Sequence, residues 1–235
     1  VILIPRYLGA FGIGQFYFAA SLWAIAGVFV AFGSNVLMTK EIARDPSRTK
    51  TLFSTTIILR TFFFALACAA LIGALKLIGY SPDTIILVGI FGFVTLIGQY
   101  SSVCQAALQG LEQMEWVSLA SISVKVVETI IVVALLLAGA DIFAFTAALL
   151  ISASVGLGIQ FFFLRRIQPL GLAFSWQSAV TMLHASTPYF FSALFLVVYA
   201  RIDVIFISFF LDETARLVLL RITESYFRHR WLYFL

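Results

Sequence analysis

The stretch VSLASISVKVVETIIVVALLLAG, residues 117–139, decides the fold of this chain. Its second half, IIVVALLLA (130–138), is apolar at every position. A membrane-spanning strand would instead alternate apolar and polar side chains over about 10 residues. A spanning helix needs roughly 20 predominantly apolar residues in a row. The stretch therefore predicts a membrane-spanning helix.

Similar stretches fill most of the chain. Hydrophobic residues make up 62% of the 235 and charged residues only 11%, with a mean hydropathy of +1.07. A soluble domain is about half apolar and about a quarter charged, so a water-soluble fold is excluded. The prediction is an all-α, polytopic transmembrane helix bundle with spans near residues 14–38, 52–79, 85–110, 117–139, 142–164 and 188–211.

Basic residues indicate the orientation of this bundle. The loop KEIARDPSRTK (40–50) carries four Lys or Arg, and the fifth span ends on Arg165 and Arg166. Cytoplasmic loops collect such residues, so both segments are expected inside. A short interfacial helix near residues 175–186, capped by Ser175, is predicted on the same surface, with Pro188 opening the sixth span.

The two ends of the chain differ from the spans. Residues 1–4 are expected to be the tail of an earlier spanning helix, stopped by Pro5, so that the sequence is a fragment of a longer protein. Residues 212–235 carry four Arg on the side predicted to be outside. They are treated as an uncertain tail, and no site is assigned there.

Five ionisable residues lie inside the apolar stretches: Arg60, Lys125, Glu128, Arg201 and Asp203. Each costs at least ~2.5 to 3.5 kcal/mol at bilayer depth on insertion scales. They therefore predict a polar interior that moves or binds something, as in a transporter. Three cations against two carboxylates make this interior mildly cationic, which suits an anionic phosphate group.

Lys125 and Glu128 share one helical face because they are three residues apart. Two interpretations stay open. The pair neutralises itself, or Lys125 binds an anionic substrate while Glu128 holds it or exchanges a proton.

The other charges also have alternatives. Arg60 either snorkels to the cytoplasmic interface or contacts substrate. Arg201 is the strongest candidate for substrate contact, against a structural ion pair, because Asp203 lies on nearly the opposite helical face. Tyr199 and Asp203, four residues apart, share a face and are expected to hydrogen-bond.

Catalytic signatures are absent from the sequence, which has no HExxH, GxSxG or P-loop motif and only two histidines. We therefore expect no enzyme and no cofactor. The net charge of +4 comes from scattered bases rather than one patch, which argues against nucleic acid.

Four segments carry a family resemblance: LGAFGIGQFYFAASLWAIAGVFVAFG (8–33), KEIARDPSRTKTLF (40–53), ALQGLEQMEWVSLASISVKVVE (107–128) and PYFFSALFLVVYARIDVIFISFFL (188–211). In order and spacing they resemble the Wzx-like polysaccharide-biosynthesis flippases, a branch of the multidrug/oligosaccharidyl-lipid/polysaccharide exporter superfamily. The resemblance implies two similar lobes around a central cavity, of which this chain would hold most of the N-terminal lobe.

The resemblance further implies a function. It predicts a transporter that flips a polyprenyl-pyrophosphate-linked oligosaccharide across the cytoplasmic membrane by alternating access. Its partners would be the lipid bilayer, this substrate, a coupling ion (H+ or Na+) and polysaccharide assembly proteins. The alternative is a multidrug or small-molecule antiporter of the same superfamily, which would need unpaired carboxylates for cationic compounds. A membrane-embedded transferase would need a catalytic base, and a scaffold would have little reason to bury Lys125 and Arg201.

Overall fold

The computed structural model describes residues 4–137, 142–169, 171 and 173–210, with side chains placed for 14–135 and, within the later ranges, for 144–199. All of its regular structure is helical: α1 (Ile4–Ala31), α2 (Ser34–Arg44), the 3-10 turn η1 (Pro46–Arg48), α3 (Thr49–Ile78), α4 (Pro82–Gly110), α5 (Met114–Leu137), α6 (Ile142–Ile167) and α7 (Trp176–Phe210). Within these ranges six segments are long and apolar enough to cross a membrane. The predicted all-α transmembrane bundle is confirmed.

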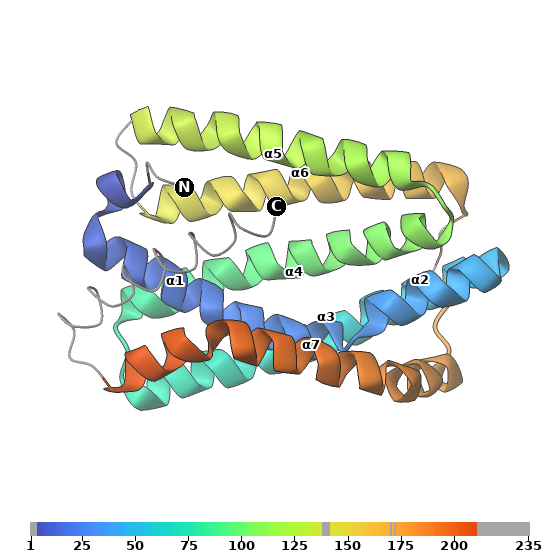
Figure 1. Cartoon of the computed structure of the whole chain (residues 1–235), viewed down its shortest axis with the longest axis horizontal. Helices are drawn as coiled ribbons and strands as arrows, with labels where there is room; N and C mark the ends of the chain where they lie inside the picture. Colours follow the sequence, from blue (N-terminus) through green and yellow to red (C-terminus); the bar gives the residue numbers. More distant parts are fainter. Residues whose placement is uncertain (1–3, 138–141, 170, 172, 211–235) are drawn as a thin grey trace.

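Helix α4 lies at the centre of the bundle (Figure 1). It packs against α1, α2 and α3 on one side and α6 on the other, while α5 packs mainly on α6. Helix α7 lies against α1, α2 and α3. Two apolar clusters fill the interior, one around Trp23, Leu87 and Val88 and the other around Met38, Val103 and Leu108.

The first span differs from the single helix expected over residues 14–38. Helix α1 extends back to Ile4, so Pro5 lies in its first turn, where a missing N–H costs nothing. The helix then stops at Ala31, and Phe32 (φ 44°) and Gly33 (φ 65°) separate it from α2. The Phe32 ring stacks on the Phe190 ring of α7 with centroids 4.5 Å apart. Tertiary contact therefore fixes this break.

The end of the chain's described part also differs from expectation. Instead of an interfacial helix followed by a span beginning at Pro188, α7 runs unbroken over 35 residues with Pro188 inside it. The predicted cap is confirmed, since the Ser175 Oγ accepts from the Ser178 N–H at 3.3 Å. A proline in a helix removes one N–H bond, and α7 continues through Pro188 while it packs on α1, α2 and α3.

The two basic segments lie at the same end of the bundle as the α4–α5 turn (Figure 1). Glu41 pairs there with Arg44 at 3.2 Å and with Arg48 at 2.7 Å. Next to them the Ser47 hydroxyl donates to the Asp45 carboxylate at 2.6 Å. This hydrogen bond lowers the pKa of Asp45 and stabilises the turn between α2 and α3.

Candidate functional site

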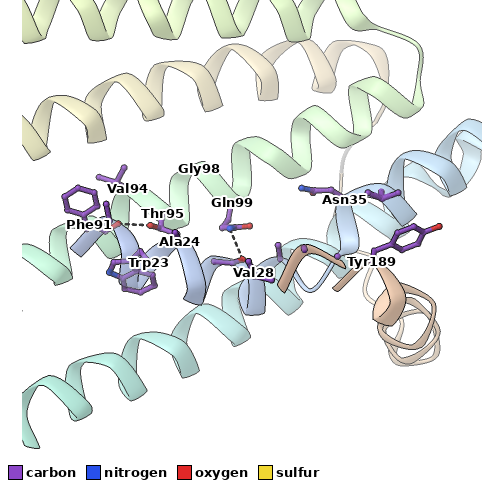
Figure 2. A pocket seen from close by; sticks show the side chains of 16 residues that line it. Trp23, Ala24, Val28, Asn35, Phe91, Val94, Thr95, Gly98, Gln99 and Tyr189 are labelled. Carbon is purple, nitrogen blue, oxygen red and sulfur yellow. Dashed lines mark hydrogen bonds between the residues drawn. The ribbon is translucent and has the colours of Figure 1, made fainter. Parts of the chain in front are cut away.

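A cavity of about 580 Å³ opens between α1, α2, α4 and α7. Figure 2 shows Trp23 and Phe91 at one end of it, Asn35 and Tyr189 at the other, and Gln99 between them. The cavity exists because many of its lining residues are glycine or alanine, whose side chains do not fill it. The lining consists of Ala20, Trp23, Ala24, Gly27, Val28, Ala31, Gly33, Asn35, Val36, Phe91, Val94, Thr95, Gly98, Gln99, Tyr189 and Ala193.

The helix break shapes one end of this pocket. A Cβ on Gly33 would lie 2.6 Å from the Phe190 nitrogen and 2.8 Å from the Ser186 oxygen, so only glycine allows α7 to approach this closely. The break also places Asn35 on a separate helix with a direction of its own. Tyr189 reaches the pocket from the facing turn of α7.

The aromatic end of the pocket is fixed by packing. Trp23 is 2% exposed, and its indole N–H donates to the Val88 carbonyl at 2.7 Å. Gly92 lies under the indole, where a Cβ would come within 2.6 Å of the ring. The Trp23 ring is therefore held in one orientation.

Uncharged polar groups line the middle of the pocket. The Gln99 side-chain NH2 donates to the Gly27 carbonyl at 3.2 Å, and the Thr95 hydroxyl donates to the Phe91 carbonyl at 3.0 Å. The Asn35 Oδ1 accepts from Arg60 at 2.6 Å. None of the described lining residues carries a charge.

Arg60 lies behind the pocket wall, 1% exposed. Its Nη1 donates to the Gln99 carbonyl at 2.6 Å, to Gln99 Oε1 at 2.9 Å and to Ser102 Oγ at 2.6 Å. Its Nη2 donates to Ser34 Oγ at 3.0 Å as well as to Asn35. The snorkelling interpretation is wrong, because the side chain is buried and α2 and α4 supply acceptors for both of its Nη groups, while its Nε has no hydrogen-bond partner among the described residues.

Lys125 and Glu128 lie on α5, away from this pocket. Their side chains form an ion pair at 2.8 Å, with 77% of the Lys125 side chain exposed and 28% of that of Glu128. The pair neutralises itself, as one of the two interpretations expected. A role in transport stays a prediction.

Tyr199, Arg201 and Asp203 lie on α7, beyond the residues that line the pocket. Tyr199 is 78% exposed. The side chains of Arg201 and Asp203 lie outside the described part, so the expected bond between Tyr199 and Asp203 and the role of Arg201 stay predictions.

Comparison with known proteins identifies the family of the chain. A family model described as polysaccharide biosynthesis protein matches residues 1–223. The chain belongs to the polysaccharide biosynthesis protein family. Neither the curated proteins nor the solved structures gave a match. Proteins of this family are typically membrane flippases and exporters rather than enzymes. In its described part this member has six helices long and apolar enough to cross a membrane, which makes it a multi-pass membrane protein.

For this polysaccharide biosynthesis protein, the structure adds pocket residues that sequence reasoning missed: Trp23, Asn35, Gln99 and Tyr189. The candidate residues taken from the sequence were five ionisable residues and Tyr199, whereas these four side chains carry no charge. The amides of Asn35 and Gln99 inside apolar stretches were an available signal, since a polar group in lipid needs a partner or a cavity. In the described part, no group of three or more His, Cys, Asp or Glu could hold a metal ion.

Proposed function

We propose that this protein flips a polyprenyl-pyrophosphate-linked oligosaccharide across the cytoplasmic membrane by alternating access. The observation that carries the proposal is a family match over residues 1–223 together with a pocket of about 580 Å³ between helices of the bundle. That volume is in the range of roughly 300 to 1,000 Å³ typical of ligand sites.

The chemistry of the pocket supports a sugar as its occupant. Trp23, Phe91 and Tyr189 offer aromatic rings, which provide large rigid contact surfaces. Asn35 and Gln99 offer amides, which hydrogen-bond to neutral hydroxyl groups. A sugar ring presents both C–H faces and hydroxyls, so it matches this combination.

The charge of the pocket helps to separate the two candidate functions. A cavity for cationic drugs would be expected to carry a carboxylate, and none of the described lining residues is acidic. This favours the flippase over the antiporter. The pyrophosphate would need cations, for which Arg201 and Lys125 stay the candidates.

Transport across a bilayer also needs a source of free energy and a supply of substrate. We propose H+ or Na+ as the coupling ion and polysaccharide assembly proteins as partners.

Complementation of cells depleted of their own flippase tests this proposal. The full-length parent gene is compared with its Trp23→Ala, Arg201→Ala and Lys125→Ala variants, at matched protein levels in the membrane. We expect the parent to restore surface polysaccharide and each variant to reduce it. Drug efflux without restored polysaccharide, across several sugar backgrounds, would establish the antiporter instead.

A further inference from the structure

We infer that Arg60 is a positioning residue of the pocket. It orients the side-chain amides of Asn35 and Gln99 without itself contacting the ligand. The inference rests on the proposed function and assigns Arg60 a different part from the substrate contact expected from sequence.

The hydrogen bonds of Arg60 divide into two groups. Asn35 Oδ1 and Gln99 Oε1 belong to side chains that line the pocket, at 2.6 and 2.9 Å from the guanidinium. The remaining acceptors, on Ser34, Ser102 and the Gln99 backbone, hold the guanidinium itself. One buried cation thus connects α3 with two pocket amides on α2 and α4.

These bonds settle which way each amide points. An amide has an acceptor oxygen on one side and a donor NH2 on the other, so an oxygen directed at Arg60 turns the NH2 away from it. The Gln99 NH2 then reaches the Gly27 carbonyl at 3.2 Å. The Asn35 NH2 makes no hydrogen bond among the described residues, and Asn35 lines the pocket. The pocket therefore presents an N–H donor at this end.

Packing alone gives no reason for a cation here. No carboxylate pairs with Arg60 among the side chains that the structure places. Removing a charge from solvent is costly when no opposite charge pairs with it. The role we infer for the guanidinium is therefore to orient two amides. Its positive charge, close to the pocket, also disfavours a cationic ligand.

The Asn35→Asp variant tests the pocket donor while it keeps the contact of residue 35 with Arg60. The carboxylate keeps an oxygen on Arg60 and gives the cation a counter-charge, but it removes the NH2 donor from the pocket. Arg60→Met removes the guanidinium, and Arg60→Lys keeps the positive charge but loses the planar set of N–H donors that reaches both amides. The matched control is Thr61→Val, which deletes the exposed Thr61–Tyr100 hydrogen bond of 2.8 Å next to Arg60 and leaves the pocket unchanged.

The measurement is the flipping of a polyprenyl-pyrophosphate-linked trisaccharide by the full-length parent and its variants in proteoliposomes, with thermal unfolding recorded in parallel. We expect Asn35→Asp to keep or raise the melting temperature and to raise KM about tenfold, the effect of losing one good hydrogen bond. We expect Arg60→Met and Arg60→Lys to raise KM as well, and Thr61→Val to leave it unchanged.

A folded Asn35→Asp variant with the KM of the parent would overturn the inference. If Arg60→Met fails to fold, Asn35→Asp still decides the question because it retains Arg60. If the parent moves no lipid-linked sugar, the proposed function fails, and binding of maltotriose takes over as the test. That binding is followed by the fluorescence of Trp23 after the other tryptophans of the parent, Trp116, Trp176 and Trp231 among them, are changed to Phe. Binding weakened about tenfold by Asn35→Asp would uphold the inference, and no binding by the parent would overturn it.

Discussion

Gly33 and Ser34 show how single residues set the path of the chain through the bundle. Gly33 adopts a φ of 65°, a region that residues with a Cβ rarely enter. The Ser34 hydroxyl then donates to the Ala31 carbonyl at 2.7 Å and accepts from Arg60. Polar groups freed by the break are thus partnered inside the protein, as the membrane interior requires.

Gly33→Ala is expected to destabilise the protein strongly. The new Cβ would meet the backbone of α7 at 2.6 to 2.9 Å, and the left-handed backbone adds about 1 to 2 kcal/mol. Overpacking contributes about 1 to 3 kcal/mol more. Thermal unfolding of the purified protein measures the loss.

Gly89→Ala is the control for this substitution. Gly89 lies within α4, and a Cβ there would meet nothing within 4 Å. The change should be neutral or stabilising by up to about 1 kcal/mol. Equal melting temperatures for the two variants would show that the break at Gly33 does not need glycine.

At the scale of helices, α5 depends on α6. Trp116 of α5 stacks on Phe163 of α6 with ring centroids 3.7 Å apart. Further along the pair, Gly156 of α6 lies directly against the Val124 side chain. In lipid, where the hydrophobic effect does not drive helices together, such close packing around small residues supplies the attraction.

Gly156→Val is expected to push α5 away from α6. Valine is stiff at χ1, and so is Val124, so neither side chain can turn aside without strain. We expect a loss of about 1 to 3 kcal/mol, seen as a lower melting temperature in lipid nanodiscs. Gly158→Val serves as the control, since a Cβ at Gly158 meets nothing within 4 Å. A similar fall in both variants would point to helix propensity instead of packing.

In the whole molecule, α5 lies at the outside of the bundle and packs mainly on α6. The Lys125–Glu128 ion pair is accompanied on that helix by exposed Ile122, Val126 and Ile130. A self-neutralised pair costs less in an apolar environment than two separate charges.

We expect single and double substitutions of this pair to differ in direction. Lys125→Met or Glu128→Met alone leaves an unpaired charge, which costs about 2.5 to 3.5 kcal/mol at bilayer depth. The double variant removes both charges and should recover the stability. Melting temperatures in nanodiscs make the comparison. A double variant as unstable as the singles would show that each charge has its own partner.

The residue types along the chain determined its class, an all-α bundle with six segments long and apolar enough to cross a membrane in its described part. Apolar stretches of spanning length, and the charged residues inside them, can be recognised from the order of residues without a structure. Ser175 was legible as a helix cap because capping acts between residues three apart. Helical spacing also offered the pairing of Lys125 with Glu128, as one of two interpretations, for the same reason.

Only the tertiary structure decided the break at Phe32–Gly33, the continuity of α7 through Pro188 and which residues line the pocket. The break depends on how closely α7 approaches Gly33. Arg60 hydrogen-bonds to Asn35 and Gln99 across 25 and 39 positions of sequence. Local rules left Arg60 either at the interface or in contact with substrate, because they could not see the acceptors that α2 and α4 bring around it. Helical periodicity fixes neighbours within one helix, whereas a site between helices depends on how their side chains fill the space between them.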